Sequence, residues 1–300
     1  MAFFRPPSAS SSSSSSFLNS VEARPAPAGG HQNKSSSNTF FVFGDDFADN
    51  GNLPLTEPVT KMSRQWAYPY GSVYTDAHGF PRPNTPSGRF SNCKIQSDFI
   101  GKALPYITTK KVLLYYASTS VIGLSSPSDT NAYIGKVTKE VAANVEQLLK
   151  LGVKKVLVNN LHPIGCTPSQ TRTNNYTACD IFGNLGASIH NDNLKQVMTV
   201  KKNVQIIDLY TSFTSIVDHA PGKGSDLSKQ FKRKLSPCCE SLDSNGYCGQ
   251  QGESSSELLY TVCDKSDKFF YWDDMHPTHA GWEAIMKQLE KPLKEFVDQE

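Results

Sequence analysis

The chain has 300 residues, and its 30 Lys and Arg side chains against 28 Asp and Glu side chains leave a formal net charge of only +2. This balance, without a basic stripe interleaved with aromatic residues, argues against nucleic acid as a partner. No apolar run reaches the roughly eighteen residues that a membrane-spanning helix needs, so the sequence predicts no transmembrane segment. With 38% hydrophobic residues, the length fits one α/β domain with a substantial core, or at most two small domains.

Residues 1–38 form a low-complexity arm rich in Ser, Pro and Gly, and we expect this arm to be disordered. A serine tract occupies the place where a secretory signal needs its apolar core, so the sequence shows no signal peptide. The Ser-rich, acid-poor opening also has features of an organelle transit peptide, although its basic residues are few. The remaining residues, 39–300, are expected to form a single domain.

The first half of this domain shows two strand patterns and one long helical pattern. The dense apolar run at 40–43 predicts a short buried strand that ends in a turn at Gly44. Residues 112–116 are a second candidate strand. Apolar residues then recur at helical spacing over 134–148, and Gly152 is expected to end that helix.

The second half continues the alternation of strands and helices. A strand is predicted at 156–158, a helix around Leu194, and a strand at 204–209. Helices placed between buried strands are typical of crossover connections and of a largely parallel sheet. The last predicted helix carries an apolar stripe over 282–296, which Pro292 is expected to kink or interrupt.

Most of the cysteines lie in two polar loops that are poor in core-forming residues. Cys166 and Cys179 bracket one loop, and the other contains four cysteines, for which three pairings are possible. Such loops gain most from disulfides in an oxidising compartment. A zinc site is the competing explanation, but no C-x-x-C spacing or nearby histidine pair supports it. Cys93 is left over and is expected to be a free core thiol. The four clustered cysteines are Cys238, Cys239, Cys248 and Cys263.

Two short motifs carry residues suited to hydrolysis. The turn FGDDF at 43–47 follows the first predicted strand, and a hydrolase nucleophile after a strand is typically held on such a turn. Asp273 and His276 are three residues apart, so within one turn the carboxylate can orient the imidazole. Taken alone, the Asp-x-x-His spacing also occurs by chance in surface turns that cap a helix. The two motifs together are more specific than either one.

Short blocks of sequence between the two motifs add to this pattern. They are FVFGDDFADNGN at 41–52, YPYG at 68–71, SGRFSN at 87–92, DFI at 98–100, PIGCTP at 163–168, the pair Cys238 and Cys239, Cys248 with Gly249, and YWDDMHPT at 271–278. In their identity and order these blocks resemble the plant GDSL esterase/lipase family of the SGNH hydrolases. The resemblance covers most of residues 39–300.

The resemblance implies a three-layer, flavodoxin-like α/β fold with a mainly parallel sheet. It places Asp46 at the position of the family's nucleophilic serine, and Asp273 and His276 at the positions of its acid and base. The Asp46 backbone would belong to the oxyanion hole, but the hole's glycine block and Gly-x-Asn-Asp block have no match here. Because 104–131 is too short for that region, we expect an element of the fold to be missing there.

Asp46 predicts ester hydrolysis that is weak or altered. A carboxylate is a weak nucleophile, and beside His276 it would favour imidazolium, which cannot act as a base. We therefore expect a member of the GDSL esterase/lipase family, which by descent is a hydrolase of carboxylic ester bonds. The alternative is a catalytically inactive relative that binds acyl or lipid-like ligands.

The expected partner is a small acyl ester or lipid-like molecule, and no cofactor is expected. Asp45, Asp46 and Asp49 could ligate a hard cation, but such carboxylates are more often turn and cap residues, so no metal is expected. The resemblance implies a secreted protein, in agreement with the clustered cysteines, and a plastid or intracellular location is the alternative. The sequence leaves the substrate and the oligomeric state open.

Overall fold

The computed structural model describes residues 40–55, 57–75, 86–103, 112–115, 127–198, 202–220, 222–253 and 257–299, all of which lie within one compact unit spanning 37–300. The predicted disordered arm at 1–38 lies outside these residues. Its disorder and the proposed domain boundary therefore remain predictions.

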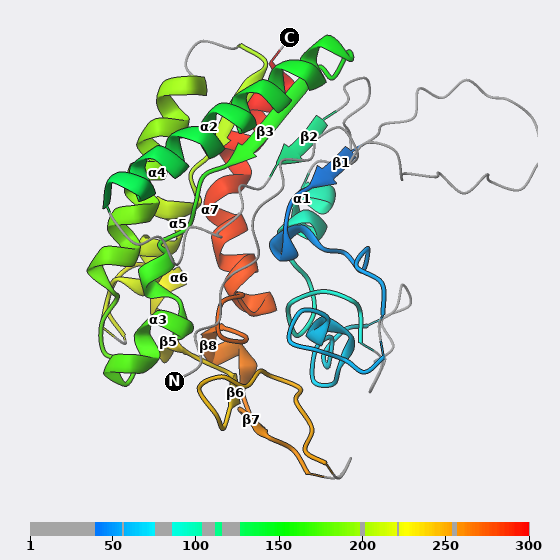
Figure 1. The fold of residues 1–300 in the computed structure, drawn as a ribbon, viewed down its shortest axis with the longest axis vertical. Coiled ribbons are helices and arrows are strands. Elements are labelled where there is room, and N and C mark those ends of the chain that lie inside the picture. The colour runs from blue at the N-terminus through cyan, green and yellow to red at the C-terminus, as the bar shows by residue number, and fades with distance from the viewer. Residues whose placement is uncertain are drawn as a thin grey trace, which may run out of the picture. The chain divides into compact units, whose positions relative to one another are not determined.

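A four-stranded parallel sheet lies between the main helices of this unit (Figure 1). The strands follow the order β1-β2-β3-β4, and each neighbouring pair is parallel. They are β1 (Phe40–Phe43), β2 (Val112–Tyr115), β3 (Lys155–Asn159) and β4 (Val204–Ile207). The mainly parallel sheet predicted from the alternation of strands and helices is confirmed.

Helices cover both faces of the sheet, because successive side chains of a strand point to opposite sides. Val156 and Val158 of β3 pack with α2 and α4 in one buried cluster, whereas Leu157 packs with α1, α5 and α7 in another. This arrangement confirms the three-layer α/β fold. The helices are α1 (Gln96–Ala103), α2 (Pro127–Lys150), α4 (Ile181–Met198), α5 (Leu209–Val217) and α7 (His279–Asp298).

The first strand differs from its prediction as a buried strand. Phe41 and Phe43 are 44% and 43% exposed. Their side chains share the sheet face that α2 and α4 cover at β3, but neither belongs to the buried cluster there, because β1 lies at the edge of the sheet, beyond β2.

The structure corrects the end of one predicted strand and selects between the alternatives for the last helix. The strand predicted at 204–209 ends at Ile207, because Asp208 caps α5 by accepting a hydrogen bond from the Thr211 N–H at 3.0 Å. The last helix, α7, is not interrupted at Pro292. Leu289 and Leu293 flank the proline and are buried in the main core, so packing holds the helix together where proline removes a hydrogen bond.

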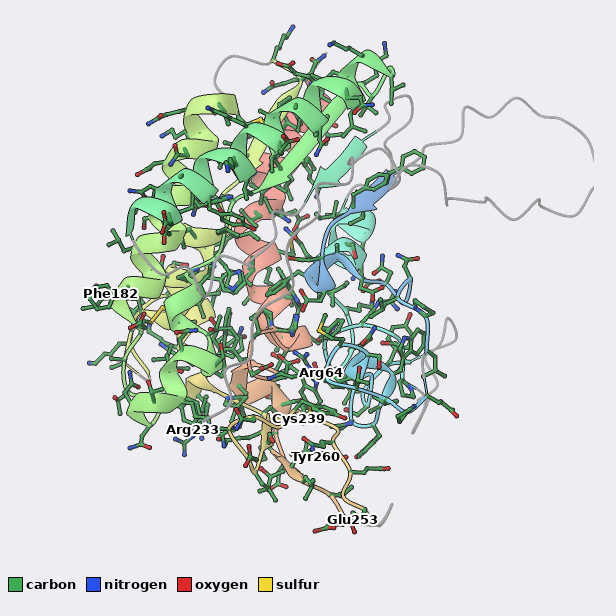
Figure 2. The ribbon with its side chains drawn as sticks, in the orientation of Figure 1. Arg64, Phe182, Arg233, Cys239, Glu253 and Tyr260 are labelled. Atoms are coloured by element: carbon green, nitrogen blue, oxygen red, sulfur yellow. A yellow bond between two sulfur atoms is a disulfide. The ribbon has the colours of Figure 1, made fainter. Side chains whose placement is uncertain are left out.

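Shorter elements connect the layers and carry the cysteine-rich loops. Strand β5 pairs with β8 in parallel, and β6 pairs with β7 in antiparallel fashion. Figure 2 labels Cys239 on β6 and Tyr260 on β7. None of the described helices combines the length and apolarity needed to cross a lipid bilayer. The elements are β5 (Arg233–Pro237), β6 (Cys239–Ser241), β7 (Tyr260–Val262), β8 (Phe269–Tyr271), α3 (Pro168–Thr171), α6 (Asp226–Lys229), and the 3-10 helices η1 (Asp46–Ala48), η2 (Arg64–Trp66), η3 (Ile164–Cys166), η4 (Arg172–Asn174) and η5 (Ser266–Lys268).

Six cysteines form three disulfides, and Cys93 is a buried free thiol, as expected. The structure selects one of the three pairings left open for the clustered cysteines. Because all four of their sulfur atoms are used in disulfides, the zinc explanation for that cluster is wrong. The bridges are Cys166–Cys179, Cys238–Cys263 and Cys239–Cys248.

Candidate functional site

Asp46 lies in the turn after β1, as the first residue of η1. Asp45 caps this turn, since its Oδ1 accepts a hydrogen bond from the Phe47 N–H at 3.1 Å. The Asp46 side chain is 35% exposed, and its Oδ2 lies 3.1 Å from Nε2 of His276. The two groups form an ion pair, but the angles at the two atoms are not those of a hydrogen bond. The turn after the first strand therefore presents a carboxylate to the imidazole.

Asp273 and His276 lie in the loop between β8 and α7. The Oδ1 of Asp273 accepts hydrogen bonds from the N–H groups of Met275 at 2.9 Å and His276 at 2.7 Å. The same oxygen lies 2.9 Å from Nδ1 of His276. The Trp272 N–H donates to the His276 carbonyl at 2.7 Å and closes the loop. This geometry fixes the imidazole ring with its Nδ1 toward Asp273 and its Nε2 toward Asp46.

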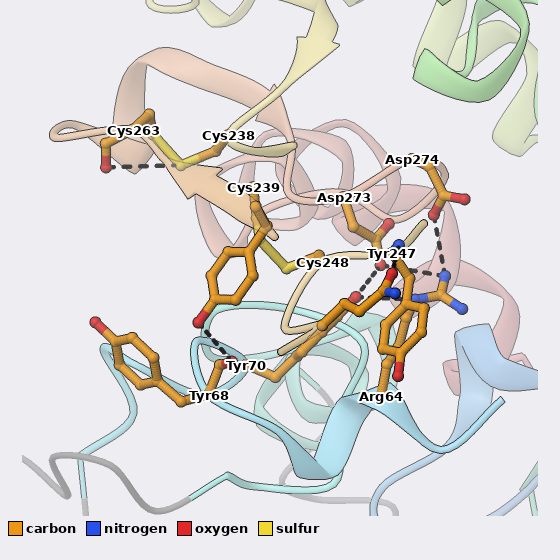
Figure 3. The surroundings of a disulfide bond; sticks show 12 residues. Arg64, Tyr68, Tyr70, Cys238, Cys239, Tyr247, Cys248, Cys263, Asp273 and Asp274 are labelled. Atoms are coloured by element: carbon orange, nitrogen blue, oxygen red, sulfur yellow. Dashed lines mark hydrogen bonds and ion pairs between the residues drawn. A yellow bond between two sulfur atoms is a disulfide. The ribbon is translucent and has the colours of Figure 1, made fainter. Parts of the chain in front are cut away.

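A buried network holds the other carboxylate oxygen of Asp273 (Figure 3). The Tyr70 hydroxyl donates to Oδ2 at 2.7 Å, and Nη2 of Arg64 lies 3.4 Å from the same oxygen. Arg64 also donates through Nε to the Tyr70 hydroxyl at 2.9 Å and through Nη2 to Asp274 at 3.0 Å. Both oxygens of Asp273 are thus engaged, so the carboxylate has a single well-defined position.

Aromatic rings enclose the imidazole on two sides. The Phe90 ring stacks on His276 with centroids 4.7 Å apart, and the Phe47 ring lies at the same distance in a tilted arrangement. Gly88 allows the Phe90 segment to approach, because it adopts φ +71° and a Cβ there would lie 2.5 Å from the Gly51 Cα. The glycines of two distant sequence blocks, at 51 and 88, therefore pack against each other.

The charges of the site are coupled. Burial opposes the protonation of His276, but the carboxylates of Asp273 and Asp46 outweigh it and raise the pKa of His276 to about 10. Burial likewise opposes the ionisation of Asp46 and Asp273, and the imidazolium of His276 outweighs it and lowers both pKa values. At neutral pH the site is therefore an imidazolium between two carboxylates. An imidazolium has no free lone pair with which to take a proton from a nucleophile.

We predict that His276 stays protonated at pH 8 and loses its proton only near pH 10. Its folded pKa is above the value of 6.5 for a free side chain, so this pairing stabilises the fold fully below pH 6.5 and is lost as the pH rises toward 10. Replacing Asp46 with Asn should lower the His276 pKa, because one of the two carboxylates is removed. The imidazole ¹⁵N chemical shifts, followed against pH, measure both values. A midpoint near 6.5 in the native chain would contradict the ion-pair arrangement.

The floor of the site is apolar and contains a second histidine. His162 is buried between the rings of Phe47 and Phe213, with centroids 4.9 and 5.1 Å away. Burial, with the nearby charge of His276, lowers the pKa of His162 to about 3, so this side chain is neutral. Burial and the Asp46 carboxylate also raise the pKa of Asp45 to about 7. Burial is the largest cause of both shifts.

The predicted oxyanion donor is the backbone N–H of Asp46. This group makes no hydrogen bond with the residues that the structure describes. The Gly-x-Asn-Asp block is absent from the sequence, and 116–126, which follow β2, lie outside the described residues. Among the described residues, Asp46 is therefore the one predicted hydrogen-bond donor to an oxyanion.

The acidic residues near the site have partners within the chain. Asp49 accepts hydrogen bonds from the N–H groups of Gly51 at 2.8 Å and Asn52 at 2.6 Å, so it is a turn residue. Asp273, Asp274 and His276 have ligand atoms within 4.8 Å of one another. The guanidinium of Arg64 already pairs with both of these aspartates. A cation at this cluster would have to displace Arg64 from them.

The structure brings together the three predicted site residues, Asp46, Asp273 and His276, although their roles remain predictions. It adds residues that sequence reasoning missed. Tyr70 and Phe90 belong to blocks that carried the family resemblance. The sequence therefore marked these two residues but did not indicate what they do. Arg64 and His162 had no such signal, because only the fold brings them to the site.

Comparison with known proteins gives an independent view of the chain. The family model described as GDSL-like Lipase/Acylhydrolase matches residues 112–289, which include the Asp273 to His276 loop and leave the Asp46 turn outside. Curated relatives from Arabidopsis thaliana match across most of the chain. The protein named GDSL esterase/lipase At5g03600 is 29% identical over 331 aligned positions, covering 86% of this chain and 94% of that protein. GDSL esterase/lipase At5g03610 is 27% identical over 325 positions, covering 84% and 86% respectively.

The lengths of these alignments bear on the missing element. Both aligned spans, 331 and 325 positions, are longer than this chain of 300 residues. The relatives therefore contain residues that have no counterpart here. This difference agrees with the prediction that part of the usual fold is absent, although it does not locate the absent part.

Proposed function

The chain belongs to the GDSL-like lipase/acylhydrolase family, and from this membership we propose that it is a carboxylic ester hydrolase by descent whose activity is weak or altered. The 3.1 Å contact between Asp46 Oδ2 and His276 Nε2 carries the proposal. In a serine hydrolase this imidazole nitrogen takes the proton of the attacking hydroxyl. Here a carboxylate without a proton stands in that place, and it keeps the imidazole charged.

Attack by Asp46 itself is a poor route to hydrolysis. The carboxylate oxygen would form an anhydride with the acyl carbon and expel an alkoxide, a much worse leaving group than a carboxylate. The backbone N–H of Asp46 could stabilise the oxyanion. Each missing oxyanion donor lowers turnover by about 100-fold to 1,000-fold in a comparable hydrolase. Slow turnover could then come from water activated by the small fraction of neutral His276.

A second candidate is a catalytically inactive relative that binds acyl or lipid-like ligands. The observation that favours it is the same ion pair, together with the absence of a Gly-x-Asn-Asp block from the sequence. Both candidates take small ester or lipid-like molecules, and neither needs a cofactor. We also propose that the chain acts in an oxidising compartment such as the cell exterior, because three disulfides support its loops.

The native chain is expected to hydrolyse nitrophenyl acetate and butyrate at a rate within about tenfold of a His276→Ala variant. In a comparable intact triad, loss of the histidine costs on the order of a million-fold in turnover, so a small difference would identify a disabled site. Initial rates at pH 7, with circular dichroism to check folding, give the comparison. A high native rate that the variant abolishes would show that Asp46 supports full catalysis and would contradict the proposal. A His276→Gln variant serves as a second test if alanine disturbs the buried loop.

A further inference from the structure

One triplet of the sequence is not explained by the proposed catalytic site. Asn175-Tyr176-Thr177 has the form Asn-x-Ser/Thr, to which cells attach N-linked glycans when it lies on the surface of a secreted protein. The triplet follows η4, in the segment between α3 and α4 (Figure 1). Short triplets of this kind also occur by chance, so their placement in the fold decides whether they can be modified.

The side chain of Asn175 is exposed, and it makes no hydrogen bond with the residues that the structure describes. Its backbone is left-handed, with φ 56° and ψ 36°. Asparagine tolerates this conformation better than most residues, so the turn uses the residue type without using the side-chain amide. The neighbouring Asn174 is different, since its Nδ2 donates to the Ala178 carbonyl at 2.8 Å. Of these two asparagines, Asn175 is the one with an accessible amide nitrogen.

The middle residue of the triplet anchors the turn to the protein. The Tyr176 side chain is half-buried, and its hydroxyl donates to a carboxylate oxygen of Glu240. The Tyr176 N–H donates to the Thr171 carbonyl at 2.8 Å. Thr177, like Asn175, is exposed. The two residues that define the acceptor therefore remain on the surface of a turn that is held from below.

The surface beside Asn175 has room for a sugar. Asn175 and Thr177 line an open cavity of about 710 Å³, which 217–220 and 232–236 also line. This volume is in the range of small-molecule sites in proteins. Ile181, at the start of α4, lines the same cavity and is 78% exposed. A sugar attached to Asn175 would therefore start at a recess in the surface, beside an exposed apolar side chain, and not against packed protein.

We propose that Asn175 is an acceptor for N-linked glycosylation, a proposal that rests on the oxidising, secretory compartment proposed above. In the reaction, Nδ2 of Asn175 forms a bond with the anomeric carbon of an oligosaccharide carried on a lipid pyrophosphate. The bond between that carbon and the pyrophosphate oxygen breaks, and the lipid pyrophosphate leaves with the electron pair. The amide nitrogen gives up one proton, and no oxidant or reductant is needed.

Expression of the full chain in cultured mammalian cells, behind a cleavable secretion leader, tests the acceptor. The chain recovered from medium and cells should migrate more slowly in gel electrophoresis than the same chain treated with peptide N-glycosidase. This enzyme converts the glycosylated asparagine into an acid. Peptide mass spectrometry should therefore find the converted residue at position 175.

Variants of the triplet separate the modification from damage to the turn. Asn175→Asp and Thr177→Ala should each abolish the glycan at 175, because neither leaves a complete triplet. Aspartate also tolerates a left-handed backbone, so Asn175→Asp removes the acceptor nitrogen and keeps the turn. Thr177→Ser should retain the glycan, because serine completes the triplet and keeps a hydroxyl where Thr177 donates to the Asn174 carbonyl at 2.8 Å.

The matched control is Asn33→Gln, which removes the other such triplet of the sequence, Asn33-Lys34-Ser35, and should leave the glycan at 175 unchanged. The proposal is overturned if the chain made behind the leader carries no glycan at 175, or carries one at Asn33 alone. Expression without the added leader distinguishes this failure from failure of the proposed compartment. A glycan that appears at 175 only behind the leader would confirm the acceptor and contradict the compartment.

Discussion

Replacing Asp46 with Ser should raise the hydrolysis of nitrophenyl esters by at least about 100-fold over the native chain. A serine hydroxyl at this position supplies a nucleophile, whose loss alone costs on the order of a million-fold in turnover in a comparable triad. The change also removes a carboxylate 3.1 Å from His276 Nε2, so the imidazole pKa falls and a neutral base becomes available. Asp273 is already fixed by Tyr70, Arg64 and two backbone N–H groups, so the acid and base need no rearrangement.

The gain should stop short of a fully active hydrolase. Each absent oxyanion donor would leave the rate about 100-fold to 1,000-fold lower than that of an intact site. Initial rates at pH 8, with Asp46→Asn as the control, measure the effect. The asparagine variant also removes the charge but supplies no nucleophile, so it should remain close to the native rate. If the serine and asparagine variants are equally slow while both are folded, the site lacks more than its nucleophile, and the ligand-binding alternative would be favoured.

Replacing Asp273 with Asn should lower the free energy of unfolding by about 3–5 kcal/mol, the range found when one partner of a buried ion pair is removed. Asp273 is 1% exposed and accepts hydrogen bonds from Tyr70 and from the N–H groups of Met275 and His276. An amide at this position keeps the size of the side chain but leaves the charges of His276 and Arg64 poorly compensated. Urea unfolding, extrapolated to water, measures the change.

The adjacent residue provides a matched control for this experiment. The Asp274 side chain is 39% exposed and shares the same Arg64 guanidinium at 3.0 Å. Because a solvent-accessible ion pair contributes little, Asp274→Asn should cost no more than about 1 kcal/mol. Equal effects of the two substitutions would mean that burial of Asp273 is not what makes it important for the fold.

The exposed edge strand β1 bears on the prediction that an element of the usual fold is missing. The relatives align over more positions than this chain contains, and the described sheet ends at β1 with Phe41 and Phe43 nearly half exposed. An apolar edge strand is usually covered or protected in native proteins. Both observations agree with an element of the usual fold being absent from this chain. The absence is predicted within 104–131, of which 104–111 and 116–126 lie outside the described part.

The sequence by itself determined the layer architecture. Hydrophobic periodicity located α2, β3 and the last helix, since each must bury one face or both faces in a core. Sequence blocks also identified the Asp46 turn and the Asp273 to His276 loop, because turn chemistry and catalytic spacing are local properties of the chain. Local patterns misjudged the burial of β1 and left open whether Pro292 would kink or interrupt the last helix, because burial and helix continuity depend on neighbours distant in sequence.

Only the tertiary structure decided how the site is held and charged. Arg64 and Asp273 are 209 positions apart, and no local pattern indicates that one neutralises the other. The pairing of four clustered cysteines and the neutral state of His162 likewise depend on which side chains the fold buries together. Electrostatic interactions and burial act through space, whereas sequence patterns report on neighbours along the chain. For that reason the sequence predicted which residues meet in the proposed catalytic site, and the fold determined their protonation.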